Sequence, residues 1–488
     1  MDITLLPSLH NLDFREWSEL TNNTKNCIKF CENIGLIGFT LNEPYAQDHN
    51  NWNFGAYMYE HLMNIYDDAD SAKLQELFGT KLYMSTSTTY IADQQRIFNI
   101  SNENNNFQSL VNLFPIKQNE HRNYNCLDKA IRQLDFDFYN DLLPTIAKWA
   151  SDHTQSKLIE PLQAHTTRTI VYTVAQARYI LANAFFLNTI PGYGNIHLNH
   201  LYNSLFDVLA SERIRCLIEY FRLSSQQNDN RQISIERYSY KSELPDWSKQ
   251  NIPIESSKFN VFTGRMEDAN EAQGFVDFAN KHIHIHRIIP SATQEEVLFS
   301  CCPEAFLSIL ACETLEDDEI VILRGCKRFV EYTGYADTFA YQGHYHEQNP
   351  AYIQDILVMD ACFSGQFTRT HIDRDLAKAW AAFYKSKDEI IVTGNWGCGV
   401  FGGDLTFKFL QQLCAAMILG DHFKRLDYSV YNDEQLASNL KNYLAKMETN
   451  KKTIADIYQM MIEYSEASEL PASRRKFSDA FEQWLNSS

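Results

Sequence analysis

The sequence has no run of about eighteen apolar residues, no CxxC pair among its eleven cysteines and no dense cluster of basic residues. Without a long apolar run, we expect no membrane span. The start, Met1–Thr4, has no basic region of the kind that opens a secretory leader. An odd number of cysteines without CxxC pairs is typical of a reducing compartment. We therefore expect a cytoplasmic protein, with the nucleus as the alternative.

Basic charge is scarce as well. The 488 residues carry 43 Lys and Arg against 62 Asp and Glu, a formal net charge of -19. Phosphate backbones are held by basic surfaces, so this balance argues against a general nucleic-acid binder, and we expect no direct DNA binding. The 44% hydrophobic and 13% aromatic content argues against wholesale disorder.

The chain divides by pattern into three regions. Residues 1–140 have helical periodicity at 56–66 and 127–135, with a polar tract at 101–106, and are predicted to be a mostly helical accessory region. Residues 141–230 form a second helical domain, with helices at 172–186 and 212–221 and a linker at 224–230. Residues 231–488 alternate strands with helices, which is typical of a mixed α/β domain flanked by helices. The strands are predicted at 233–237, 259–262, 274–278, 319–323, 355–360 and 389–393, and the helices at 295–300, 305–312, 376–384, 405–419, 452–466 and 473–485.

Two adjacent carboxylates follow one of these strands at a short distance. Gln294, Glu295 and Glu296 lie at the start of a predicted helix, downstream of the strand that ends at Asn280. Neighbouring residues at a helix start point about 100° apart, so one carboxylate can reach a ligand while the other supports it. Alone, such a triplet is more often a solvated helix N-terminus, where negative charge suits the dipole.

A glycine-rich segment, Thr393–Asp404, joins a predicted strand to a predicted helix. Glycines there let backbone N–H groups approach an anion closely, and the following helix N-terminus favours negative charge. A tight structural turn is the alternative explanation. Two aromatic residues, Tyr335 and Tyr431, are further candidates, although each could equally be a half-buried core residue.

Together these segments resemble the catalytic domain of the poly(ADP-ribose) glycohydrolases. The resemblance rests on Val276–Asn280, on Gln294–Glu296, on Glu331–Asp337 and on the glycine-rich segment, and it covers roughly residues 140–465. It implies a macrodomain-like mixed sheet preceded by a helical accessory domain. It also implies an ADP-ribose ligand, with no cofactor and no metal.

The resemblance further implies roles for individual residues. Glu296 would be the general acid, and Glu295 and Asn280 would hold the ribose. Glu267 and Tyr431 would contact adenine, and Tyr335 would lie along the ADP. The remaining ligand-binding candidates are Gln294, Asn395, Gly397, Gly399 and Phe401.

The chain departs from the family at one place. The family carries three consecutive glycines where this sequence has His284, Ile285 and His286. A β-branched residue is among those least able to adopt a positive φ, so we expect a strand extension or a rebuilt turn, with two imidazole rings where phosphate oxygens would bind. In a strand, His282, His284 and His286 would share one face, and a metal site there, with His344 or His346, is an alternative to hydrogen bonding.

Three functions remain open at this point. The leading expectation is a glycohydrolase family member with weak or no hydrolysis, kept as a structural or interaction subunit of a larger assembly with protein partners. The second is an active poly(ADP-ribose) glycohydrolase that uses Glu296. The third is a reader that binds ADP-ribose or poly(ADP-ribose) without cutting it.

Overall fold

The computed structural model describes residues 124–487, apart from 158, 188–191, 203, 205, 227–228, 241–243, 347–352 and 467–476. These residues fall into two compact units. The smaller comprises 134–160 and 178–199, and the larger comprises 124–133, 161–177 and the chain from 200 onwards. The candidate site residues all belong to the larger unit. The predicted helix at 56–66 and the polar tract at 101–106 lie outside the described residues.

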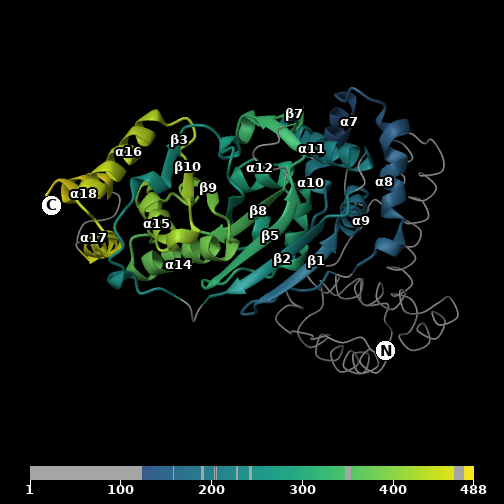
Figure 1. Cartoon of the computed structure of the whole chain (residues 1–488). Coiled ribbons are helices and arrows are strands. Elements are labelled where there is room, and N and C mark those ends of the chain that lie inside the picture. The colour runs from purple at the N-terminus through teal and green to yellow at the C-terminus, as the bar shows by residue number, and fades with distance from the viewer. Residues whose placement is uncertain are drawn as a thin grey trace, which may run out of the picture. The chain divides into compact units, whose positions relative to one another are not determined.

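The larger unit is built on an eight-stranded sheet in the order β1-β2-β5-β8-β4-β9-β10-β3 (Figure 1). Strands β8, β4, β9, β10 and β3 run parallel to one another, whereas β1, β2 and β5 are antiparallel to their neighbours. The strands are β1 Arg168–Thr173, β2 Gln232–Ser239, β3 Phe259–Phe262, β4 Gly274–Ala279, β5 Glu319–Lys327, β8 Ile353–Asp360, β9 Ile390–Gly394 and β10 Arg425–Ser429. A separate antiparallel pair consists of β6 Val330–Thr333 and β7 Ala340–His344. The predicted macrodomain-like mixed sheet is thereby confirmed.

Helices cover the sheet. Helix α14, Arg369–Ser386, packs on β8 and β5, and α15, Leu405–Met417, lies beside α14. Helix α12, Gln294–Cys301, contacts β4 and also α11, Asp207–Gln226. All five residues of β9 are buried, as expected of a strand covered on both faces. The remaining helices of this unit are α7 Asn125–Arg132, α10 Asn199–Tyr202, α13 Leu307–Ala311, α16 Glu434–Thr449, α17 Ile454–Glu466 and α18 Phe477–Asn486.

The smaller unit contains α8, Leu143–Ala150, and most of α9, Val174–Phe185. The buried amide of Asn183 donates hydrogen bonds to the carbonyls of Ala150 (3.0 Å) and Tyr179 (2.9 Å), so a polar side chain inside this helical unit is satisfied. The helical character predicted for this part of the chain is confirmed.

The six predicted strands are all present, but four others were not predicted. Strand β1 ends at Thr173, where a helix was expected to have begun at Tyr172. Strand β10 escaped notice because its apolar pattern is broken by Arg425 and Asp427, which bond each other at 2.7 Å. The linker predicted at 224–230 begins later, because α11 continues to Gln226.

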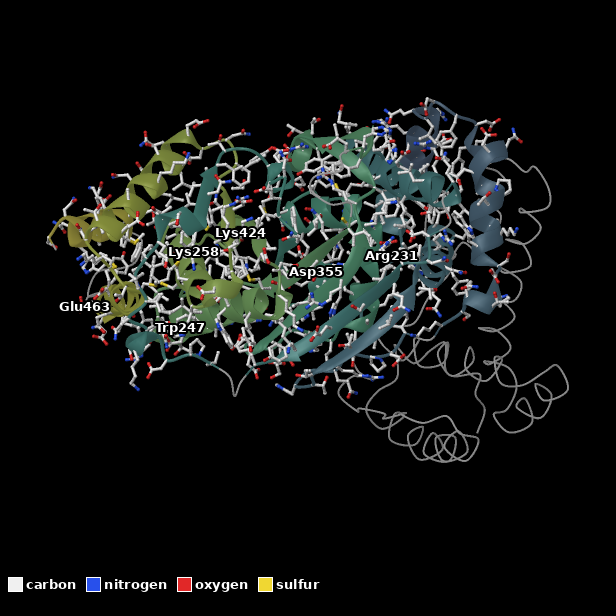
Figure 2. All side chains as sticks on the ribbon, in the orientation of Figure 1. Arg231, Trp247, Lys258, Asp355, Lys424 and Glu463 are labelled. Atoms are coloured by element: carbon white, nitrogen blue, oxygen red, sulfur yellow. The ribbon has the colours of Figure 1, made fainter. Side chains whose placement is uncertain are left out.

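Buried charged residues join elements that are distant in the sequence. Arg231, labelled in Figure 2, precedes β2 and binds the carboxylate of Glu304, beyond α12, through two bonds of 2.7 Å. Bidentate pairs of this kind fix orientation as well as charge. None of the helices in the described part of the chain has the length and apolar character needed to cross a bilayer.

Candidate active site

The candidate residues gather at the carboxyl ends of the parallel strands. Asn280 follows β4, Asn395 follows β9 and Tyr431 follows β10. Glu267, in a single 3-10 turn at Met266–Asp268, follows β3. Because the carboxyl ends of parallel strands meet at one edge of a sheet, residues far apart in the sequence line one region, which is where open α/β sheets bind ligands.

Helix α12 presents the two glutamates to this edge. The side chain of Gln294 holds the helix on β4: its carbonyl accepts the N–H of Phe278 (2.7 Å) and its amide donates to the carbonyl of Val276 (3.0 Å). Glu296 accepts hydrogen bonds from the backbone N–H (2.9 Å) and the hydroxyl of Thr293, which is a capping-box arrangement. The side chain of Gln294 therefore helps to position the two glutamates.

Glu295 points toward the end of β4. Its carboxylate accepts the backbone N–H of His284 (2.6 Å) and that of Asn280 (3.4 Å). Both glutamates are buried, at 4% and 6% exposure for Glu295 and Glu296. The expectation that they were merely solvated at a helix N-terminus is excluded by this burial.

A third carboxyl group, that of Asp277, lies with them and was not singled out from the sequence. It is fully buried on β4, and no described residue donates a hydrogen bond to either of its oxygens. Burial raises the pKa of Asp277 well above its ordinary value, and Glu296 raises it further. The sequence did offer a signal: an acidic residue in the middle of a predicted strand, among apolar neighbours, indicates a buried carboxyl group.

The protein shifts the pKa values of the two glutamates in opposite directions. Burial raises the pKa of Glu295 well above its ordinary value, and Asp277 and Glu296 add to this effect. Burial acts in the same direction on Glu296, but it is outweighed by His284, by the hydrogen bonds from Thr293 and by Arg213, so that the pKa of Glu296 is lowered. This arrangement favours the protonated form of Glu295 and the charged form of Glu296.

Residues 284–286, where the resemblance implies three glycines, have a left-handed backbone, which glycine favours. His284, Ile285 and His286 have φ angles of 53°, 49° and 54°, and they end a short 3-10 segment, Ile283–His286. The left-handed region costs an L-residue roughly 1–2 kcal/mol. Of the two expectations, the strand extension is wrong and the turn is found: residues 283–286 turn, in a conformation that a Cβ disfavours.

The histidine rings do not enter the site as expected. The ring of His284 is fully buried against Phe299 and Phe306, at centroid distances of 5.2 and 5.5 Å. The ring of His286 lies 5.1 Å from that of His282, and burial lowers its pKa to about 4. The expectation of two rings in the place of phosphate oxygens is wrong for His284, because its side chain is part of the core.

The three alternating histidines do not form a shared strand face, since residues 283–286 turn. His282 bonds the hydroxyl of Thr314 at 2.8 Å, whereas His284 bonds the carbonyl of Arg287 at 2.8 Å. Among residues 124–487, with the gaps given above, no group of three or more His, Cys, Asp or Glu is placed to hold a metal ion. Hydrogen bonding, the other expectation, describes His282 and His284.

Arg213 of α11 is a further residue that sequence reasoning missed. It is 3% exposed and donates to the carbonyls of Ile289 and Ser291 (2.9 Å for Ser291) and to the hydroxyl of Ser300 (3.0 Å). Its Nη2 lies 3.4 Å from Nε2 of His284. It therefore joins the accessory helix to the loop and to α12. A predicted amphipathic helix gives no sign of which charged residue turns inward.

The glycine-rich segment folds as a loop between β9 and α15. Gly397 has a φ of 73°, and a Cβ there would lie 2.5 Å from that of Ala361, so only glycine fits. Gly399 has no neighbouring atom within 4 Å of the place where a Cβ would be, so this part of the backbone is open to a ligand. Asn395 receives a hydrogen bond from the hydroxyl of Tyr428 (3.3 Å). Phe401 packs against the exposed ring of Phe363 at 5.3 Å.

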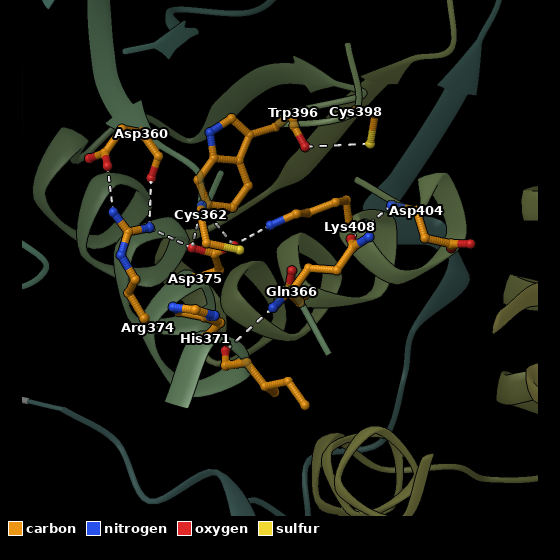
Figure 3. Close-up of polar contacts among 12 residues, drawn as sticks. Asp360, Cys362, Gln366, His371, Arg374, Asp375, Trp396, Cys398, Asp404 and Lys408 are labelled. Carbon is orange, nitrogen blue, oxygen red and sulfur yellow. Dashed lines mark hydrogen bonds and ion pairs between the residues drawn. The ribbon is translucent and has the colours of Figure 1, made fainter. Parts of the chain in front are cut away.

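A buried charge network lies beneath this loop (Figure 3). Lys408 of α15 is fully buried, pairs with Asp375 and lies over the ring of Trp396, 4.6 Å from its centroid. Trp396 in turn donates its indole N–H to the carbonyl of Met359 (3.0 Å). Arg374 continues the network by bonding Asp375 at 2.6 Å. These contacts hold the loop from below.

Two aromatic residues mark another side of the site. The rings of Tyr335 and Tyr431 lie 5.9 Å apart, and each residue is about two-fifths exposed. Exposure of 41% and 40% agrees with a contact surface rather than with core packing. Burial raises the pKa of Tyr335, and Glu296 contributes to the increase, so this phenol is close to the carboxyl cluster. Glu267 is nearly buried and hydrogen-bonds the phenol of Tyr332.

Comparison with known proteins gives one consistent result. Residues 132–237 match the family model described as "Poly (ADP-ribose) glycohydrolase (PARG), helical domain", and residues 244–438 match "Poly (ADP-ribose) glycohydrolase (PARG), Macro domain fold". Among curated proteins, poly(ADP-ribose) glycohydrolase 1 of Caenorhabditis elegans is 25% identical over 52% of this chain and 35% of its own length. The Arabidopsis thaliana protein of the same name is 26% identical over 55% of this chain and 64% of its own length.

The chain thus spans less than two thirds of the length of these relatives. A solved poly(ADP-ribose) glycohydrolase from Deinococcus radiodurans, in complex with ADP-ribose, is 14% identical over 44% of this chain and 93% of that one, with a TM-score of 0.26.

Proposed function

Because the chain belongs to the poly(ADP-ribose) glycohydrolase family, we propose that it hydrolyses the ribose–ribose O-glycosidic bonds of poly(ADP-ribose). The observation that carries this proposal is the left-handed backbone of residues 284–286, which are not glycines. A strand extension in that place would have removed one side of the pocket. Because residues 284–286 have the left-handed backbone that glycine favours, the main sequence argument for an inactive protein is weakened.

In this proposal Glu296 is the general acid. It protonates the leaving ribose oxygen while positive charge develops at the anomeric carbon, and it then assists the attack of a water molecule. Glu295, whose carboxyl group accepts two backbone N–H groups, would bind the ribose together with Asn280. Asn395, Gly397, Gly399 and Phe401 would hold the phosphates and distal ribose, and Glu267, Tyr335 and Tyr431 the adenosine.

The ionisation of Glu296 favours a second candidate. A general acid must carry its proton, yet hydrogen bonds from Thr293 and the charge of Arg213 lower the pKa of Glu296. If the bound ligand does not reverse this shift, the chain binds ADP-ribose or the end of the polymer and releases it uncut. A structural subunit with protein partners, and a cytoplasmic or nuclear location, also remain proposals.

The deciding experiment compares Glu296→Gln with the unchanged protein in a poly(ADP-ribose) hydrolysis assay and in a calorimetric titration with ADP-ribose. We expect Glu296→Gln to lower turnover by about 10²–10⁴-fold and to leave the dissociation constant for ADP-ribose within about threefold. The control is Glu271→Gln, the same change at a glutamate that is 61% exposed and pairs with Arg425. Binding without turnover in the unchanged protein would establish the reader, and the absence of both would refute each ligand-based proposal.

A further inference from the structure

The 284–286 loop holds a conformation that its residues do not favour, so something outside the loop must stabilise it. Three consecutive non-glycine residues have φ angles near 50°. Strained backbone persists only where the surroundings over-determine it. The contacts that do so here come from two side chains, Arg213 and His284.

Arg213 reaches the loop from α11, 71 residues earlier in the chain. Its guanidinium binds the loop at His284, the spacer at Ile289 and Ser291, and helix α12 at Ser300. Ser300 connects Arg213 to Glu296, because its hydroxyl donates a hydrogen bond to the backbone carbonyl of Glu296 (2.7 Å). The rigid five-donor fork of arginine suits such a junction, and the single ammonium of lysine cannot reproduce it.

The ring of His284 is the other half of the junction. Nδ1 lies 2.8 Å from the carbonyl of Arg287, which can only accept, so Nδ1 carries the proton. Nε2 is then an acceptor, and it faces Nη2 of Arg213. Phe299 and Phe306 pack on the ring, and the backbone N–H of the same residue is bound to Glu295. Both the side chain and the main chain of His284 are thus fixed.

We infer that Arg213 and His284 form a clamp that holds residues 284–286 in the left-handed conformation. Glycine would adopt this conformation without such contacts, because it has no Cβ. The role of the clamp in ligand binding rests on the proposed function, since the backbone that it holds would bind the diphosphate of ADP-ribose. Arg213 and His284 are positioning residues. They act through the loop and through Glu295, and they need not touch the ligand.

The first test needs no ligand. Arg287 is exposed and directly follows the loop, so cleavage by trypsin after Arg287 reports whether the loop opens. We expect Arg213→Met to increase the rate of this cleavage at least about tenfold. The matched control is Arg215→Met on the same helix, whose guanidinium binds Glu212 and lies over Tyr341, and we expect no more than about a twofold change there.

The second test measures how strongly the effect of Arg213 on ADP-ribose binding depends on the residues at 284–286. Arg213→Met should weaken ADP-ribose binding at least about tenfold, about 1.4 kcal/mol, and should raise KM for the polymer more than it lowers kcat. In a chain with glycine at 284, 285 and 286 the same Arg213→Met change should cost less than about threefold, because glycine needs no clamp. An equal cost in both backgrounds would mean that Arg213 supports the fold in general, and the clamp would be refuted.

The two tests separate this inference from the proposed function. If the unchanged protein does not bind ADP-ribose, the proposed function fails, and the cleavage assay alone still judges the clamp. If Arg213→Met does not fold, Arg213→Lys and His284→Ala remove the same contact from either side. Cleavage at Arg287 that is no faster in these variants than in Arg215→Met would overturn the clamp.

Discussion

Replacing Ile285 by glycine should stabilise the protein relative to replacing it by alanine. Both changes remove the same half-buried side chain, so packing cancels in the comparison. What remains is the backbone, whose φ at this position is 49°. Alanine keeps the cost of the left-handed region, roughly 1–2 kcal/mol, and glycine does not.

Glycine has a cost of its own in the unfolded chain. It loses about 0.5–1 kcal/mol more conformational freedom on folding than alanine does. The difference between the two terms leaves Ile285→Gly more stable than Ile285→Ala by about 0.5–1 kcal/mol. In a domain of this size, each kcal/mol of added stability raises Tm by about 2–4 °C.

The measurement is urea unfolding of both variants, followed by circular dichroism. Lys281, an exposed residue outside the set with positive φ, supplies the control: there Lys281→Ala should be more stable than Lys281→Gly by about 0.5–1 kcal/mol. The prediction is thus a reversal of rank between two nearby positions. If glycine ranks below alanine at both positions, the loop is not left-handed, and the strand extension expected from the sequence becomes the better description.

Three further predictions concern charges. Lys408→Met should destabilise the fold by about 1–3 kcal/mol because the buried carboxylate of Asp375 loses one of its two cationic partners and keeps only Arg374, and adding Asp375→Leu should recover part of this loss; urea unfolding that shows no recovery would contradict the pairing. Burial raises the pKa of Asp388 to about 7, so the folded state loses stability as pH rises from about 4 to about 7, and Asp388→Asn should raise Tm at about pH 8 but not at about pH 4. Since the pKa of Glu296 lies below its ordinary value of 4.5, kcat/KM should keep rising as pH falls from about 8 to about 5, and a plateau below about pH 7 would identify another acid.

The sequence predicted the sheet well where its strands are buried on both faces, because continuous apolar runs such as 390–392 are typical of such strands. It failed at β10, where a charged pair interrupts the run, and at β1, whose exposed residues alternate with buried ones directly before a helix. The pattern of apolar residues along a segment indicates how buried that segment is. It does not reveal the distant residue that pairs with a buried charge.

The site was predicted by resemblance, and the contacts within it were not. Glu295 and Glu296 were expected at a helix start and are found there. The strand extension expected at 284–286 is wrong because intrinsic preference was treated as decisive, whereas a distant arginine and a buried ring stabilise the left-handed turn. The placement of Arg213 depends on tertiary contacts, and no spacing rule within α11 would reveal it.

The position of Arg213 also bears on how this protein can be divided. A fragment beginning at residue 231 would contain both glutamates, the 284–286 loop and the glycine-rich segment, and it would look complete by its motifs. It would lack α11, Asp207–Gln226, and with it the guanidinium that binds the loop, the spacer and α12. Under the proposed function, the segment needed to bind ADP-ribose therefore begins upstream of residue 231, because α11 supplies the contacts that hold the 284–286 loop.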